Sequence, residues 1–178
     1  MNDEEWLTNR AIVHRLRVRY AETDKAGIVY HANFLIWFHE ARDAAFRAWA
    51  EDATRKRYKW SGHFQEIVAR GRAIGSDSLE EAGYRFLVVD TSCHHVSPAR
   101  YGDELDITVV PRRTNVAKLM FGYKVLNAKT GRRLAEGNTA SVIINPAGQM
   151  LVRMPAEFAW IFGEFPADSE PAAKAYAR

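Results

Sequence analysis

Among its 178 residues, the sequence contains a single cysteine, Cys93. One cysteine excludes a disulfide within the chain, and sparse cysteine is typical of the reducing cytoplasm. The sequence also lacks an apolar run of the roughly 18 residues that a membrane-spanning helix needs. Its opening stretch, MNDEEWLTNR, is acidic and has no apolar core of a secretory signal. We therefore expect a cytoplasmic protein with no membrane span.

Internal repeats are absent, and so are low-complexity segments before the C-terminal tail. The composition, with 47% hydrophobic and 26% charged residues, is that of an ordinary globular protein. Its length suits one domain, which we expect over residues 1–165, with an extended loop region at about 51–83. Residues 166–178, rich in Ala, Pro and charge, are expected to form a flexible tail.

No recognisable metal or nucleic-acid motif is present either. The six histidines do not occur with Cys or carboxylates at the spacing of a zinc or iron site. His94 and His95 are adjacent on a predicted strand, so we expect them to face opposite ways. The net charge of +3 favours an anionic ligand, but no zinc-finger or RNP signature indicates nucleic acid. Cys93, without a nearby base motif, is expected to be a small buried hydrophobe.

What the sequence does contain is strong periodicity. Residues 12–20 alternate with a period of two, which predicts a half-buried strand. Residues 32–50 carry apolar side chains at three- and four-residue steps, which predicts one helix with an apolar face. The expected inner face of the strand comprises Ile12, His14, Leu16, Val18 and Tyr20. That of the helix comprises Phe34, Trp37, Phe38, Ala41, Ala45, Ala48 and Trp49.

From residue 84 onward, β-rich segments separated by turn residues predict four antiparallel strands. NAKTGRR, residues 127–133, is expected to be a hairpin loop in which Gly131 adopts a positive φ. Pro155 is expected near the start of a short helix. The order is thus strand, long helix, loop region and four strands. One amphipathic helix and one antiparallel sheet bury each other's apolar faces, which is an α+β arrangement in two layers.

The stretch LRVRYAETDKAGIVYHANFLIWFHEAR, residues 16–42, resembles the active-site signature of the 4-hydroxybenzoyl-CoA thioesterase family. The match is closest to the branch of acyl-CoA thioesterases associated with the Tol–Pal system. SPARYGDELDI and AKLMFGYKVLNAKTG are similar to further segments of the family. The resemblance covers residues 12–50 and 84–146. It implies a hotdog fold, in which an antiparallel sheet wraps a long central helix, and a homodimer or homotetramer with active sites between subunits.

For chemistry, the resemblance implies that Asp24 attacks the thioester carbonyl or acts as general base for water. A thioester hydrolase also needs donors for the oxygen that gains charge, and the first N–H groups of a helix have no partner inside it. By position, the backbone N–H of His31 would supply one. The resemblance carries Gly27, Val29 and Tyr30 over as substrate-binding residues. Taken from the residues alone, an Asp at this place is usually a helix-cap or turn residue, and His31 is either an active-site or a structural histidine.

Basic residues flank the predicted strand that begins near residue 118. The resemblance implies that Arg112, Arg113 and Lys118 meet the phosphates of coenzyme A by charge-assisted hydrogen bonds. A solvated loop is the alternative interpretation. Glu40 and Asp43 lie where other hotdog thioesterases carry their acid or base. We expect them instead on the polar face of the helix, with Asp43 paired to Arg47.

The sequence thus predicts an acyl-CoA thioesterase that uses no metal or redox cofactor, with acyl-CoA as its small-molecule partner. One alternative is a non-catalytic hotdog protein that binds acyl-CoA or acyl carrier protein. Another is an enoyl-thioester hydratase, although the acid–histidine motif of those enzymes is not found. The acyl group, its carrier and the choice between dimer and tetramer stay open.

Overall fold

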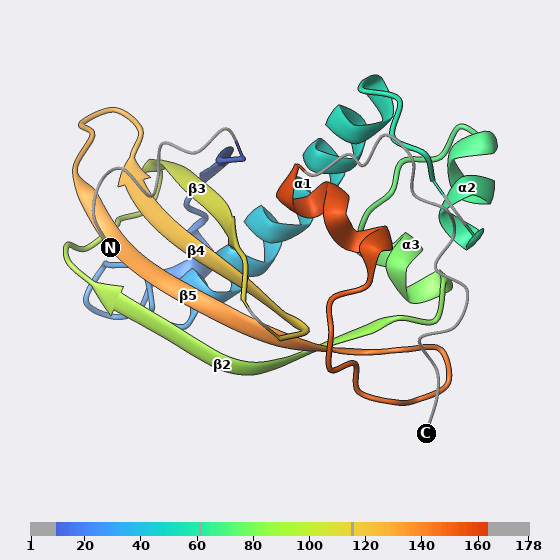
Figure 1. The fold of residues 1–178 in the computed structure, drawn as a ribbon. Helices are drawn as coiled ribbons and strands as arrows, with labels where there is room; N and C mark the ends of the chain where they lie inside the picture. The colour runs from blue at the N-terminus through green and yellow to red at the C-terminus, as the bar shows by residue number, and fades with distance from the viewer. Residues whose placement is uncertain (1–9, 61, 115, 164–178) are drawn as a thin grey trace.

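The computed structural model describes residues 10–60, 62–114 and 116–163. Its elements follow the predicted order (Figure 1). The helices are α1 (Asn33–Arg55), α2 (Gly62–Ala69) and α3 (Ser76–Glu81), with 3₁₀ helices η2 (Tyr20–Glu22) and η3 (Ala156–Phe162). The strands are β1 (Ile12–Arg17), β2 (Arg85–His95), β3 (Glu104–Arg112), β4 (Lys118–Asn127) and β5 (Arg133–Ile144).

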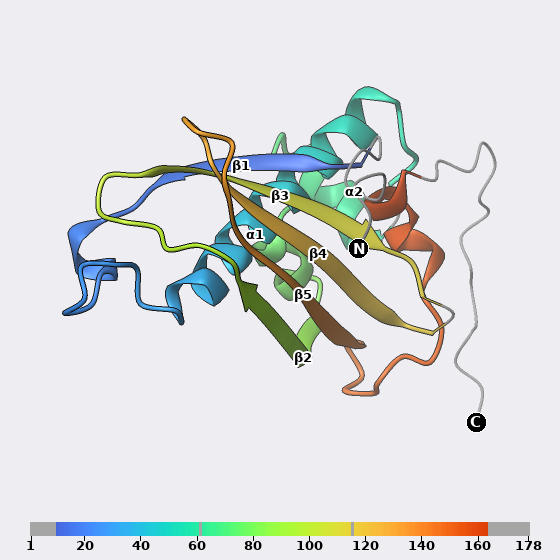
Figure 2. The ribbon, with the colours of Figure 1, turned by 90° about the vertical axis from the view of Figure 1, so that its left-hand side faces the viewer.

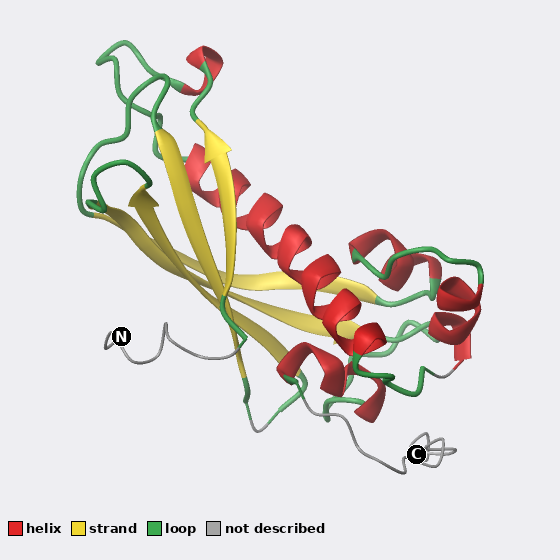
Figure 3. Cartoon of the chain, turned by 90° about the horizontal axis from the view of Figure 1, so that it is seen from above, coloured by secondary structure: helices red, strands yellow, loops and turns green. Residues whose placement is uncertain are grey.

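The five strands form one antiparallel sheet in the order β1-β3-β4-β5-β2, and α1 lies along one of its faces (Figure 2, Figure 3). Aromatic rings join the two layers. Phe38 of α1 stacks on Tyr123 of β4 with ring centroids 4.3 Å apart, and Trp49 stacks on Phe121 at 6.0 Å. The two-layer α+β arrangement is confirmed.

Gly137 of β5 permits the close approach of helix and sheet. A Cβ added there would lie 2.5 Å from the Phe38 ring and 2.4 Å from the carbonyl oxygen of Ser92. Both distances are far inside van der Waals contact, so only glycine fits at this crossing. The N-terminal half of α1 therefore sits close beneath β2 and β5.

Two predicted boundaries are wrong. The expected helix at 32–50 continues to Arg55, because Ala50 and Ala53 extend its buried face. Tyr20 is not on the inner face of a strand: it lies in η2 and is 77% exposed. The strand ends at Arg17, and after Val18 the chain turns away from the sheet edge, so the alternation ends there as well.

The region at 51–83 contains more helix than expected. Both α2 and α3 fall within it, and Phe64, Ile67 and Leu79 bury their side chains in the main core. Over the described residues, this packing joins the region to the main core. The predicted tail at 166–178 lies outside the residues that the structure describes. No described helix is both long enough and apolar enough to span a membrane.

Candidate active site

The segment between β1 and α1 forms a closed loop. Thr23 and Val29 pair as an antiparallel bridge, and the N–H of Asp24 donates to the carbonyl of Ile28 at 2.9 Å. Gly27 turns the chain with φ of 69°, in the left-handed region that favours glycine. Val29 is buried and donates its N–H to Ala99, which fixes the loop against the segment before β3.

Asp24 stands at the exposed tip of this loop. Its Oδ1 accepts a hydrogen bond from the N–H of Ala26 at 2.8 Å, which is the turn role that the sequence allowed. Within the described chain, no group donates to the second oxygen, Oδ2. One carboxylate therefore holds the turn with one oxygen and leaves the other open to a ligand.

Glu22 fastens the loop to α1. Its carbonyl oxygen accepts from the N–H of Tyr30 at 2.9 Å and from the side-chain amide of Asn33 at 2.7 Å. Its carboxylate accepts from the indole of Trp37 at 3.0 Å and from the N–H of Arg19 at 2.6 Å. The start of the helix and the Asp24 loop are thus held as one unit.

The turn that leads into α1 has unused donors. Its N-cap is Ala32, which has no side chain to accept a hydrogen bond, and its first turn contains no acidic residue. The first bonds of the helix start at the N–H groups of Asn33 and Phe34. The N–H groups of His31 and Ala32 have no acceptor in the described chain. Such groups carry the partial positive charge of a helix start and can stabilise an oxyanion.

A cluster of rings surrounds this helix start. Tyr30 and His31 lie with ring centroids 4.4 Å apart, and His31 is 6.3 Å from the ring of His95 on β2. His95 also makes an edge contact with Phe34 at 4.8 Å. The sequence does not point to His95, because it lies more than sixty residues beyond His31 and no local motif includes it.

The environment of His95 differs from that of its neighbour. The pKa of His95 lies below the ordinary value of a histidine. Partial burial of the ring is the largest cause, followed by the nearby His31 and His94. His94 points to the other face of the sheet, where it lines a hollow of about 250 Å³ with Ser92, Glu136 and Asn138. The expectation that the two histidines face opposite ways is confirmed.

The expected phosphate-binding residues lie at the other end of the sheet. The Asp24 loop contacts Ala99 and Arg100, just before β3 begins. Arg112 ends that nine-residue strand, about 27 Å farther on at the usual rise per residue. Arg113 lies over the ring of Phe162, and Lys118 is exposed at the start of β4. Within one chain, the fold does not bring these residues to Asp24.

The carboxylates of α1 do not form a rival site. Asp43 makes the expected ion pair with Arg47 on the outer face of the helix. Glu40 is half-buried beside β1, in a groove that it shares with His14 and Tyr101. Cys93, also half-buried, packs against the core, and burial raises the pKa of its thiol to about 11. A thiol with that pKa is protonated at neutral pH and is a poor nucleophile.

Comparison with known proteins agrees with this arrangement. A profile described as the thioesterase-like superfamily matches residues 18–162. The putative acyl-CoA thioesterase YneP of Bacillus subtilis is 30% identical over 112 residues, which cover 63% of this chain and 64% of that one. A 1,4-dihydroxy-2-naphthoyl-CoA hydrolase of Prochlorococcus marinus is 28% identical over 148 residues, 82% of each chain.

The fold has a counterpart among solved structures. Slr0204 of Synechocystis, described as a 1,4-dihydroxy-2-naphthoyl-CoA thioesterase, superposes with a TM-score of 0.60 at 21% identity. The match covers 86% of this chain and 96% of that one, which supports the hotdog arrangement of sheet and helix. With the profile spanning most of the chain, the protein belongs to the thioesterase-like superfamily and is a thioester hydrolase.

Proposed function

We propose that the protein is an acyl-CoA thioesterase that releases a free carboxylic acid and coenzyme A, with Asp24 as its base or nucleophile. The observation that carries the proposal is the exposed Asp24 carboxylate, on a loop that Glu22 ties to a helix start with unused N–H groups. A carboxylate and oxyanion donors on one rigid unit are the parts that acyl transfer to water requires.

In the proposed reaction, the thioester carbonyl oxygen accepts from the N–H of His31, with that of Ala32 beside it. As general base, Asp24 takes a proton from water through Oδ2 while the water oxygen attacks the carbonyl carbon. The tetrahedral intermediate then collapses and the C–S bond breaks, so that coenzyme A leaves as a thiolate. The proton on Asp24 passes to this thiolate, which regenerates the carboxylate, and the carboxylic acid product loses its own proton to solvent. As nucleophile, Asp24 would instead form an anhydride that water opens. Neither route changes an oxidation state, so no redox cofactor is required.

The same proposal includes a homodimer formed through β2. This strand is at the edge of the sheet and exposes Leu87, Val88 and Val89, each about half accessible to solvent. An exposed apolar edge strand is a template for pairing with a second copy. If two β2 strands pair antiparallel about a two-fold axis, the Arg85 end of one lies beside the His95 end of the other.

That pairing accounts for the position of the basic residues. Strand register places Arg112 opposite Met120, Lys118 opposite Val142 and Arg85 opposite Ile144, so all lie at one end of the sheet. In the dimer, Arg112, Arg113 and Lys118 of one subunit would face the Asp24 loop of the other. We propose that they bind the phosphates of coenzyme A across the interface, with Gly27, Val29 and Tyr30 on the loop side.

The relatives bear on the acyl group. The names of several concern 1,4-dihydroxy-2-naphthoyl-CoA, and two concern acyl-CoA in general. We propose acyl-CoA as the substrate class and leave both the aromatic branches and the Tol–Pal-associated branch as candidates. The test is a panel of aliphatic and aromatic acyl-CoAs, in which free thiol and free acid are measured together. Equal amounts of both products are expected for at least one ester; thiol release from none would reject the proposal.

A further inference from the structure

His95 approaches the candidate site from a part of the chain that the loop and helix do not include. It ends β2, where its partner in the sheet is Ala135. The next two residues, Val96 and Ser97, both donate their N–H groups to the carbonyl of Leu134. These bonds fix the backbone after His95, and the pairing of His94 with Glu136 fixes it before, so the ring is held beside α1 by the sheet.

The ring of His95 covers Phe34 and faces His31. Phe34 is only 3% exposed and packs on Trp37 with centroids 5.0 Å apart, so it forms a rigid apolar floor. His95, His31 and Tyr30 are exposed above it, and Tyr30 is 49% accessible. The result is a surface of ring faces and edges beside the unused N–H groups of the helix start.

The nitrogen atoms of this surface have little to bind within the chain. Among the described residues, the ring nitrogens of His95 have one polar contact: Nδ1 lies 3.9 Å from the Cys93 sulfur, which is a weak hydrogen-bond partner. His31 makes ring contacts but no side-chain hydrogen bond among the described residues. Partial desolvation of the ring, with His31 and His94 nearby, holds the pKa of His95 below its ordinary value, so its imidazole is neutral near pH 7 and offers one donor and one acceptor.

We propose that His95 is a specificity-determining residue that, together with His31, hydrogen-bonds a hydroxyl substituent on the acyl group. The inference rests on the proposed thioesterase function. When the thioester carbonyl carbon is held at Asp24, the acyl group and coenzyme A extend from it in different directions. The ring surface is largely apolar, so it suits the acyl group better than the charged coenzyme. A plain apolar acyl group would leave both imidazoles without a partner, whereas a hydroxyl would satisfy one or both.

The test pairs two variants with two ligands. His95→Phe keeps a ring against Phe34 and removes both nitrogens, and His94→Phe makes the same change on the opposite face of the same strand. Steady-state kcat/KM is measured for benzoyl-CoA and for its 2-, 3- and 4-hydroxy derivatives. Binding of the same four esters to Asp24→Asn, with and without His95→Phe, is measured by calorimetry, which gives a readout that does not need turnover.

For His95→Phe we expect a loss of about 10- to 100-fold on at least one hydroxylated ester, the size of a lost hydrogen bond to the ligand, with benzoyl-CoA within about twofold. His94→Phe should change neither, and His95→Gln should recover part of the loss. An equal loss on all four esters would mean a structural role and would overturn the proposal, as would no loss. Equal affinity of Asp24→Asn for hydroxylated and plain esters would also overturn it. Absence of thiol release, by contrast, would reject the hydrolase function, and the calorimetry would still decide the role of His95.

Discussion

At the scale of single residues, the candidate site depends on Glu22 as much as on Asp24. Glu22 is half-buried, and its backbone carbonyl and both carboxylate oxygens accept hydrogen bonds from four different residues. These bonds join the Asp24 loop, η2 and the first turns of α1. The sequence shows Glu22 only as an acidic residue within the signature, because the groups that donate to it come from both sides of the loop and are brought together by folding.

Replacing Glu22 with Ala should therefore misplace the loop as well as weaken the fold. The indole of Trp37 and the N–H of Arg19 lose their acceptor, which we expect to cost about 1–3 kcal/mol of unfolding free energy. Because Asp24 itself is intact, kcat should fall while the protein stays folded. Urea unfolding followed by tryptophan fluorescence gives the first quantity and thiol release the second. Glu80→Ala, an exposed change on α3, is the control; equal stability and kcat in both variants would contradict the role given to Glu22.

At the scale of elements, periodicity was enough to predict the strands and α1, but not where each one ends. The apolar face of α1 continues through Ala50 and Ala53. Because alanine side chains are small, they are a weak sequence signal for a buried helix face. The sequence does not predict the pair of helices within residues 51–83, because glycines stand at their ends and Phe64 and Leu79 show their burial only in the folded chain. Asp24 and His31 follow from a local motif, whereas His95 joins them through strand pairing.

The two edge strands of the sheet are expected to differ in their role in dimer formation. The apolar edge of β2 should hold a dimer, and Val88→Lys would place a charge at that edge. We expect this variant to be monomeric by light scattering and to lose most activity, because the basic residues then no longer reach Asp24. The matched control is Val13→Lys, at another exposed valine on the opposite edge strand. A dimer that survives Val88→Lys, or dissociates equally with Val13→Lys, would contradict the proposed interface.

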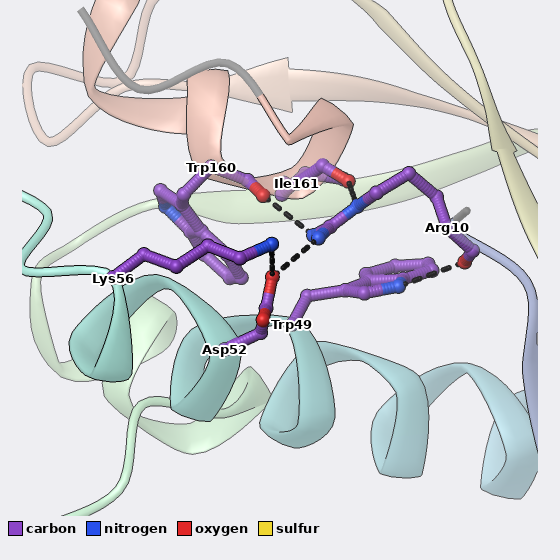
Figure 4. Close-up of polar contacts among 6 residues, drawn as sticks. All are labelled: Arg10, Trp49, Asp52, Lys56, Trp160 and Ile161. Carbon is purple, nitrogen blue, oxygen red and sulfur yellow. Dashed lines mark hydrogen bonds and ion pairs between the residues drawn. The ribbon is translucent and has the colours of Figure 1, made fainter.

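At the scale of the whole molecule, Arg10 connects the beginning of the described chain with its end (Figure 4). Its guanidinium donates to the carbonyls of Trp160 at 2.7 Å and Ile161 at 3.2 Å, and to Asp52 at 3.0 Å. Its own carbonyl accepts from the indole of Trp49 at 3.0 Å. The lead-in to β1, the end of α1 and η3 are thereby held together at the far end of the helix from Asp24.

Removal of this side chain should weaken the fold without changing the chemistry. Arg10→Ala leaves two carbonyls without their donor, although Asp52 keeps Lys56, so we expect a loss of about 2–3 kcal/mol. The KM and kcat of the folded fraction should be unchanged at a temperature well below the midpoint. Arg70→Ala, which alters an exposed side chain on the surface, is the control. A fall in kcat without a fall in stability would contradict this assignment.

The most direct test of the central claim is the rate of thiol release by Asp24→Asn. Asparagine keeps a side-chain oxygen for the Ala26 N–H, so the turn is preserved while the charge and basicity are lost. For the best ester of the panel, we predict a kcat about 10²- to 10⁴-fold below that of the unaltered protein, the range for loss of a general base. Asp77→Asn, on the exposed surface of α3, should retain full activity. If Asp24→Asn hydrolyses the ester as fast as the unaltered protein, Asp24 is only a turn residue and the proposed mechanism is wrong.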